Sequence, residues 1–299
     1  MWSGCAARAC WAPEMPTRRY DDSPGFGSLY ARTVKATLRK AEYEPDLDGL
    51  TLELPRATVD QDRLTAYREV TGFPAGPALP VTYPHILAFP LHLDLMSDPS
   101  FPYKPMGIVH LGNTITQLKP LPMHAEYSIT VHSGPERPHP KGTVFEVLSS
   151  VSVDDEVVWT DTTTLLSRSS GTPSAHADLL PEPGLEPTAI WDLKANLGRR
   201  YAAASGDRNP IHLFKLSAQA FGFPRQIAHG MWAKAASLAS IQRSGGLPDA
   251  YTVRVDFRKP LLLPSRVTFA HSRKGDAVDF AIYNDDHSVT HLIGQLQPR

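Results

Sequence analysis

Residues 230–243 read GMWAKAASLASIQR, a stretch rich in alanine that runs up to Gly245 and Gly246. The composition predicts a helix over 230–243, because alanine and leucine favour helices and a glycine pair is typical of a helix end. Apolar and polar residues alternate after it, which indicates strands at 251–258, 265–272, 277–284 and 288–296. A largely apolar helix followed by an antiparallel run predicts an α+β fold, with a sheet wrapped around the helix.

The residues that lead into this helix, RQIAHGM at 225–231, leave two interpretations of Gly230 open. Because glycine has no side chain, a ligand could approach its N–H closely, and a helix start favours the negative charge of an oxyanion. The alternative is that the glycine only admits tight packing between helix and sheet.

Further upstream, residues 201–212 read YAAASGDRNPIH. Asn209 is a good N-cap and Pro210 suits a first helical position, so His212 falls in the first turn of a short helix and Asp207 in the loop before it. An aspartate and a histidine turned toward one cavity can polarise one water and share proton transfer. The alternative is that Asp207 merely caps the helix and that His212 is a partly buried, hydrogen-bonded residue.

The chain also contains an internal repeat. Four matches occur in the same order in both halves, at offsets of 134, 140, 133 and 131 residues: Tyr67–Gly72 with Tyr201–Gly206, Gln117–Leu121 with Phe257–Leu261, Lys141–Gly142 with Lys274–Gly275, and Asp154–Asp155 with Asp285–Asp286. Nearly constant spacing in one order indicates two copies of one fold.

A stretch with serine, glycine and four prolines separates the two copies at residues 167–187. Such a composition predicts an extended linker. We therefore expect a flexible N-terminal extension at 1–20, of which 1–14 precede a second methionine, a first domain at 21–166, and a second domain at 188–299. Packed as a pseudo-dimer with their sheets joined edge to edge, the two domains would protect their exposed strand edges.

Composition excludes several classes of protein. The net charge is −1 with no long block of one sign, so no nucleic-acid partner is expected. No apolar run approaches the roughly 18 residues of a membrane span. The two cysteines, Cys5 and Cys10, offer no disulfide framework, which favours a cytoplasmic setting. His287 and His291 share a face of a predicted strand without a third ligand, so no metal site is expected.

The pattern Ser205-Gly206-Asp207-x-Asn209-Pro210-x-His212, followed by Ala228-His229-Gly230-Met231, resembles the signature of the MaoC-like (R)-specific enoyl-CoA hydratases, also called hydratase 2. That family has the hotdog fold, a long central helix wrapped by an antiparallel sheet. The motif residues match the family strongly over 201–232. The rest of the second half matches only in its pattern of helix and strands, and the first half is similar to the family mainly through the internal repeat. It implies two tandem hotdog domains.

The resemblance implies a hydro-lyase in which Asp207 and His212 are the catalytic pair. They would deprotonate a water that adds to the β-carbon of a trans-2-enoyl thioester, and return a proton to the α-carbon to give an (R)-3-hydroxyacyl thioester. The reverse dehydration would use the same groups. The N–H of Gly230 would bind the thioester oxygen, and Asn209 would hold the loop or the water.

The resemblance also implies that no metal, nicotinamide or flavin is required, and that coenzyme A or acyl carrier protein carries the substrate. A coenzyme A thioester brings phosphates. The basic residues nearest the motif are the candidates to contact them, with a solvated surface role as the alternative for each: Arg208, Arg225, Arg258 and Lys259.

The first half departs from this pattern. Phe73 follows Thr71-Gly72 where the second half has Asp207, and no Asn-Pro-x-His follows. Tyr67 and His85 are 18 residues apart, against 28 between Tyr201 and His229, so the catalytic loop is predicted to be shortened. We interpret this half as a degenerate hotdog that accommodates a long or bulky acyl chain. Its stretch ILAFPL at 86–91 fits that role or core packing, and its proline would kink a helix.

Two other functions remain to be weighed against hydration. One is a non-catalytic acyl-thioester-binding subunit, which has no need of both Asp207 and His212. The other is a hotdog thioesterase, whose attack at the carbonyl differs from the addition of water to a double bond that this loop favours. The sequence leaves open whether two such chains form a homodimer.

Overall fold

The computed structural model describes residues 16–38, 50–172 and 178–299. The helices are α1 (Phe26–Leu38), α2 (Gln61–Thr71), α3 (Tyr83–Ser97), α4 (Leu197–Ser205), the 3-10 turn η1 (Pro210–His212), α5 (Lys215–Gln219) and α6 (Gly230–Gly245). The strands of the first half are β1 (Thr17–Arg19), β2 (Thr51–Ala57), β3 (Val109–Gln117), β4 (Tyr127–His139), β5 (Gly142–Val153) and β6 (Glu156–Arg168). Those of the second half are β7 (Pro187–Leu193), β8 (Tyr251–Phe257), β9 (Ser265–Lys274), β10 (Ala277–Asn284) and β11 (Thr290–Pro298).

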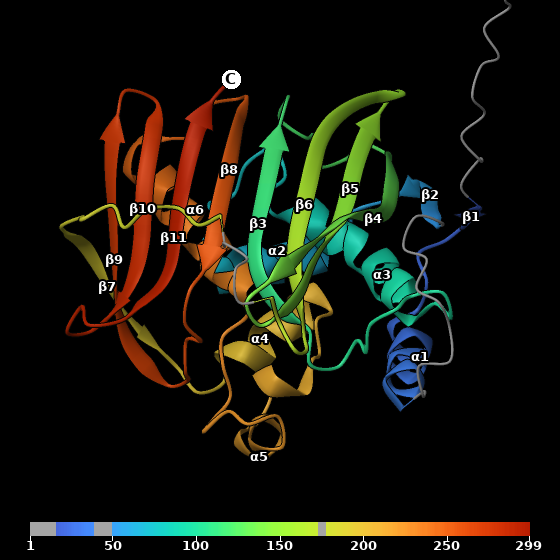
Figure 1. Cartoon of the computed structure of the whole chain (residues 1–299). Coiled ribbons are helices and arrows are strands. Elements are labelled where there is room, and N and C mark those ends of the chain that lie inside the picture. Colours follow the sequence, from blue (N-terminus) through green and yellow to red (C-terminus); the bar gives the residue numbers. More distant parts are fainter. Residues whose placement is uncertain (1–15, 39–49, 173–177) are drawn as a thin grey trace, which may run out of the picture.

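One sheet contains all eleven of these strands, in the order β1-β2-β4-β5-β6-β3-β8-β11-β10-β9-β7 (Figure 1). The order β2-β4-β5-β6-β3 in the first half is repeated in the second as β7-β9-β10-β11-β8, in the opposite direction. The two halves meet where β3 pairs antiparallel with β8, from Gly112 opposite Asp256 to Gln117 opposite Tyr251. This arrangement confirms the predicted double hotdog and the edge-to-edge junction of its two sheets.

The central helices α3 and α6 lie on one face of this sheet, behind it in the view of Figure 1. Residues 231–239 of α6 are all buried, and the alanines among them allow the helix to lie close to the strands. The core is one apolar cluster that extends through both halves. Trp232 of α6 also donates a hydrogen bond to the carbonyl of Val70 in α2, at 2.8 Å, so the helices of the two halves are tied together.

The four sequence matches fall on equivalent places in the two halves. In the match of Tyr67–Gly72 with Tyr201–Gly206, the two glycines are the C-caps of α2 and α4. Both adopt the left-handed conformation, with φ of 83° and 81°. Such a φ is strained for a residue with a side chain, which explains why glycine ends each helix. The other matches fall at the ends of β3 and β8 and at two pairs of hairpin turns.

The N-terminal prediction is wrong for the residues just before position 20. A flexible extension was expected over 1–20, but Thr17–Arg19 form β1, which pairs in parallel with β2. Arg18 lies 3.1 Å from Asp94 and 2.7 Å from Asp98, both in or just after α3, and these ion pairs hold the short strand in place. Residues 1–15 lie outside the described part of the chain.

The other elements differ from the prediction only at their ends. The central helix extends to Gly245, and α3 contains Pro90, where the sequence predicted a kink. Within the expected linker at 167–187, the first two residues belong to β6 and the last to β7, while Leu180 donates its N–H to Asp256 at 2.6 Å. Residues 173–177 lie outside the described ranges, and the boundaries 21–166 and 188–299 stay predictions. In the ranges that the structure covers, no helix is both long and apolar enough to cross a membrane.

Candidate active site

A cavity of about 790 Å³ lies between the two halves of the molecule. Its walls come from α1, α3, β3 and β6 of the first half and from the loop after α4 and the start of α6 in the second. Asp207, Asn209, His212 and Gly230, the four residues predicted to act on the substrate, all line it.

The carboxylate of Asp207 is placed by the turn that ends α4. The left-handed Gly206 redirects the chain, and a Cβ at this position would lie 2.2 Å from the ring of Phe26, so only glycine fits. Asp207 then accepts a hydrogen bond from the N–H of Asn209 at 3.1 Å. It is Asn209, not Asp207, that caps the next turn, through its side-chain oxygen and the N–H of Ile211. The N-cap was therefore predicted correctly, and the interpretation of Asp207 as a mere cap is wrong.

The ring of His212 is held by one hydrogen bond from Nδ1 to the carbonyl of Ile227, at 2.8 Å. A carbonyl only accepts, so Nδ1 carries the hydrogen. Burial lowers the pKa of His212, against the opposing effect of Asp207, which keeps the ring neutral at pH 7. A neutral imidazole protonated on Nδ1 has a bare Nε2, which can take up a proton.

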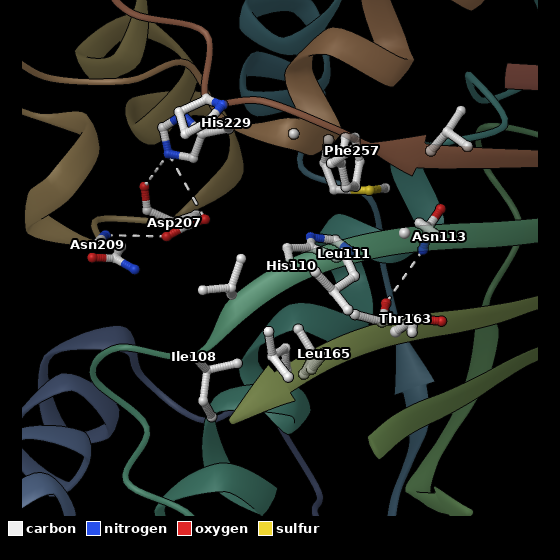
Figure 2. A pocket seen from close by; sticks show the side chains of 18 of the residues that line it. Ile108, His110, Leu111, Asn113, Thr163, Leu165, Asp207, Asn209, His229 and Phe257 are labelled. Atoms are coloured by element: carbon white, nitrogen blue, oxygen red, sulfur yellow. Dashed lines mark hydrogen bonds and ion pairs between the residues drawn. The ribbon is translucent and has the colours of Figure 1, made fainter. Parts of the chain in front are cut away.

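His229 also belongs to the site by its contacts, and sequence reasoning assigned it no role although it stands within the quoted motif. It is the N-cap of α6, and its ring stacks on that of His212 with centroids 3.7 Å apart. Its Nε2 donates to the backbone carbonyl of Asp207 at 3.0 Å and lies 3.8 Å from the carboxylate (Figure 2). His229 therefore ties the loop that carries Asp207 to the helix that begins at Gly230.

Electrostatics favour an ionised Asp207 between neutral histidines. Burial raises the pKa of Asp207, but His229, His212 and the N–H of Asn209 together outweigh it, and the pKa falls below its usual value. Burial lowers the pKa of His229 to about 3. One polar atom from each of Asp207, His212 and His229 lies within 4.8 Å of the others. A single water or hydroxyl group can bridge a gap of that size with two hydrogen bonds.

Gly230 is the first residue of α6, where a backbone N–H has no partner within the helix. Gly230 lines the same cavity as Asp207. A Cβ on Gly230 would lie 2.9 Å from the ring of Phe257, which supports the interpretation of close packing. The role of its N–H as a donor to an oxyanion stays a prediction.

Comparisons with known proteins identify the family of this chain. Residues 188–292 match the family described as MaoC like domain. Over 254 residues the chain is 34% identical to 3-hydroxyacyl-thioester dehydratase X of Mycobacterium tuberculosis, a match that covers 84% of this chain and 90% of that protein. The chain belongs to the MaoC-like dehydratase family. Its enzyme class is accordingly that of the hydro-lyases.

Solved structures show the same architecture as this MaoC-like dehydratase. The crystal structure of HtdX from Mycobacterium tuberculosis has a TM-score of 0.74 at 32% identity, and the match covers 83% of this chain and 100% of that one. A MaoC-like dehydratase from Phytophthora capsici has a TM-score of 0.71 at 17% identity, covering 85% and 96% of the two chains. The second likeness concerns the fold alone.

The basic residues of the MaoC-like chain divide into two groups. Arg258 and Lys259 line the cavity, whereas Arg208 and Arg225 do not, and the predicted contacts with the carrier stay predictions. Arg258 also lies 3.6 Å from Asp256, so part of its charge is already compensated. Sequence reasoning missed four further cations that line the cavity. Three come from the first half, far from the motif, and the fourth lies in β8 just before Arg258: Arg137, Lys141, Arg168 and Arg254.

Helix α1 contributes a second unforeseen contact to the catalytic loop. The hydroxyl of Tyr30 donates to the carbonyl of Gly206 at 2.9 Å and accepts from the N–H of Arg208 at 2.6 Å. These two bonds bracket Asp207. Nothing near the motif could have indicated them, since α1 lies more than 170 residues earlier in the chain.

The first half lacks the catalytic loop, as predicted, but the repeat was misaligned at His85. The residue equivalent to His229 is Thr82, which is the N-cap of α3 and accepts a hydrogen bond from Tyr67 at 2.8 Å, just as the ring of Tyr201 contacts His229. His85 stands one turn further along, inside α3.

Two groups of side chains have the composition of metal ligands: Asp207, His212 and His229, and in the first half His85, His92 and Asp161. The sequence did not predict the second group, because its members come from one helix and a distant strand. Hydrogen bonds within the protein already engage each histidine: His85 with Asp161, His92 with Ser149, and the other two with backbone carbonyls. The expectation that no metal is used stays a prediction.

Proposed function

We propose that this chain catalyses the reversible hydration of trans-2-enoyl thioesters to (R)-3-hydroxyacyl thioesters. The proposal rests on one observation: Asp207, His212 and Gly230 at the start of α6 line the same cavity. Asp207 is ionised there, and His212 is neutral with a bare Nε2. The named activity of the mycobacterial relative, a 3-hydroxyacyl-thioester dehydratase, supports the same reaction class.

In the direction of hydration, a water lies between the carboxylate of Asp207 and Nε2 of His212. His212 takes a proton from the water, whose oxygen attacks the β-carbon of the enoyl group. Negative charge then builds on the thioester oxygen, where the N–H of Gly230 stabilises it. The pair returns a proton to the α-carbon, and Asp207 stabilises the imidazolium in between. Dehydration follows the same steps in reverse.

The remaining parts of the proposal concern the carrier and the setting. Arg258 and Lys259 would contact the phosphates of coenzyme A or of a phosphopantetheine arm on acyl carrier protein. No cofactor is proposed, because the groups described supply both proton transfers and the oxyanion donor. A homodimer and a cytoplasmic location stay predictions, and light scattering of the purified chain tests the first.

The test uses crotonyl-CoA and a longer trans-2-enoyl-CoA, and follows the absorbance of the conjugated thioester. Asp207→Asn and His212→Ala should each lower kcat by about 10²- to 10⁴-fold, as expected for the loss of a general acid–base group. Asp285→Asn is the matched control, since that carboxylate is exposed and forms a surface ion pair with Arg266 across 3.3 Å. Thermal unfolding confirms that the variants fold.

Unchanged turnover in both site variants would refute the assignment. Tight binding of the thioester without turnover would instead support a non-catalytic binding subunit. Release of free coenzyme A thiol, with the double bond intact, would support a thioesterase.

A further inference from the structure

One edge of the sheet has basic residues from both halves of the molecule. Strand β6 ends at Arg168 in the first half, and β8 ends just before Arg258 and Lys259 in the second. Both strands pair antiparallel with β3, one on each side of it, so their ends lie at the same edge. In Figure 1 this is the lower edge, toward α4 and α5. The basic residues therefore lie on the same side of the sheet as the loop with Asp207, which follows α4.

Lys141 belongs to the same edge. It lies in the turn between β4 and β5, and its neighbour Gly142 pairs with Arg168. The side chains of Lys141 and Arg168 are exposed, and both residues line the cavity. Neither side chain forms an ion pair or a hydrogen bond in the part of the chain that the structure describes. Both cations are therefore free to bind an anion from solution.

The charges around the cavity leave an excess of cations at this edge. Among the described residues, every acid that lines the cavity, apart from Asp207, forms an ion pair with a lining arginine: Glu146 with Arg137 at 2.7 Å, Asp178 with Arg254 at 3.1 Å, and Asp256 with Arg254 at 3.3 Å. Three lining cations have no such partner in the described ranges: Lys141, Arg168 and Lys259. Such an excess attracts an anion with several charges.

The two carriers of acyl thioesters differ in their phosphates. The phosphopantetheine arm of acyl carrier protein has one phosphodiester with a single negative charge, which one cation can balance. Coenzyme A has a diphosphate on that arm and a further phosphomonoester on the 3′-oxygen of its ribose. A phosphomonoester alone has a charge of about −1.5 to −2 at pH 7. Three unpaired cations therefore fit coenzyme A better than a phosphopantetheine arm.

The spacing of the cations also suits two separate phosphate groups. Arg258 and Lys259 follow β8, and in the proposed function they contact a phosphate that both carriers have. Arg168 lies on β6, which is two strands from β8, or about 10 Å at the usual spacing of strands. Lys141 lies further away, at the turn between β4 and β5. A second phosphate, which only coenzyme A has, can therefore lie beyond the first.

We propose that Lys141 and Arg168 bind the 3′-phosphate of coenzyme A. This inference rests on the proposed hydration reaction and narrows its substrates to coenzyme A thioesters. The ammonium group of Lys141 and the guanidinium group of Arg168 donate charge-assisted hydrogen bonds to the phosphate oxygens. The first half, which lacks the Asp207 loop, thereby recognises the carrier.

The experiment compares three thioesters of the same enoyl group: crotonyl-CoA, crotonyl-3′-dephospho-CoA and crotonyl-acyl carrier protein. At low ionic strength, kcat/KM should be about five- to thirtyfold higher for crotonyl-CoA than for crotonyl-3′-dephospho-CoA, because two exposed charge-assisted contacts are lost without the phosphate. The difference should lie in KM, with equal kcat, since the 3′-phosphate is remote from the reacting carbons.

Variants then test the two residues. Lys141→Met and Arg168→Met should each lower the ratio of the two kcat/KM values, and the double variant should bring it to one. None of them should change the kinetics of crotonyl-3′-dephospho-CoA. Lys141→Arg keeps the charge and should keep the ratio. Lys274→Met, at an exposed lysine that does not line the cavity, is the matched control and should leave the ratio unchanged.

Equal kcat/KM values for crotonyl-CoA and crotonyl-3′-dephospho-CoA in the unaltered protein would overturn the inference, and so would a preference that survives in the double variant. A higher kcat/KM for crotonyl-acyl carrier protein, lost in the same variants, would overturn it as well and assign the cations to a protein carrier. Absence of turnover of all three thioesters refutes the proposed function instead. Calorimetry with coenzyme A and 3′-dephospho-coenzyme A then still measures the phosphate preference as a ratio of Kd values.

Discussion

The proposed chemistry depends on a histidine and an aspartate, His212 and Asp207, that are held in different protonation states. His212 and His229 stack closely, and burial lowers the pKa of both, so their rings are neutral. Asp207 keeps its charge because the two neighbouring rings and the N–H of Asn209 lower its pKa. A base and an anion can thus coexist at pH 7 in the proposed site.

The pH dependence of the reaction should reflect these states. The pKa of His212 is lowered from 6.5, so the base is already unprotonated above that pH, and Asp207 loses its charge only below 3.8. We expect kcat/KM to be constant from pH 6.5 to neutral and above, and to fall only on the acid side as His212 takes up a proton. A pH–rate profile whose acid limb has its midpoint above pH 6.5 would contradict the assignment of His212 as the base.

His229 should act as a positioning residue. His229→Phe keeps a stacked ring beside His212 but removes the hydrogen bond to the carbonyl of Asp207. Small displacements of a catalytic group are costly, and we expect kcat to fall by about 10²-fold with a smaller change in KM. His132→Phe, the same substitution on β4 and away from the cavity, serves as the control. A parallel loss in both variants would indicate a general effect of the substitution.

Among the elements, α1 has a larger part than its place in the chain suggests. The ring of its Phe26 packs against Gly206, and the hydroxyl of its Tyr30 forms hydrogen bonds with Gly206 and Arg208 on either side of Asp207. Helix α1 of the first half therefore covers a loop of the second half. An N-terminal helix thereby supports the Asp207 loop, which belongs to the second copy of the fold.

Removal of the Tyr30 hydroxyl tests this support. Tyr30→Phe loses two hydrogen bonds, which should lower the free energy of unfolding by about 1–3 kcal/mol and reduce kcat/KM. Tyr103→Phe, which loses a bond to Glu136 away from the cavity, should leave kcat/KM unchanged. Denaturant unfolding and steady-state rates measure the two effects, and equal rates in the two variants would argue against a role for α1 in the site.

The elements also show where sequence reasoning works and where it ends. The Asn209 cap, the Pro210 turn and helix α6 follow from local propensity, and the repeat predicted the paired halves. Strand β1 was missed because three residues carry no periodic signal and depend on Asp94 and Asp98, far along the chain. The same reason explains why sequence reasoning missed three polar residues of β3 and β6. The pairing of these strands brings together residues that are far apart in the sequence, and their spacing does not predict it: His110, Asn113 and Asp161.

At the scale of the whole molecule, Lys234 connects the two halves. Its side chain extends from α6, the central helix of the second half, and its ammonium group donates hydrogen bonds to Asn113 in β3 of the first half. Asn113 lies in the part of β3 that pairs with β8. Burial lowers its pKa from 10.5 to about 7, with Asp161 acting in the opposite direction.

This lysine should make stability depend on pH in a defined window. Between pH 7 and 10.5 the unfolded chain binds more protons at Lys234 than the folded one, so its contribution to the free energy of unfolding rises with pH, and it is constant below about 7. Lys234→Met should lose this rise, whereas Lys274→Met, at an exposed lysine, should keep it. Urea unfolding at pH 7, 8 and 9 measures the slopes; identical slopes in the unaltered protein and Lys234→Met would exclude the effect.

The short connection from Gly72 to Thr82, beside the long one from Gly206 to His229, has a consequence for how this enzyme can change. In a symmetric pair of identical subunits, every substitution appears twice and must suit both positions. Here the two copies share one polypeptide, so the first half can vary without any change at Asp207 and His212 in the second. We therefore expect mutation in the first half, which lacks the Asp207 loop, to change which acyl chains are accepted.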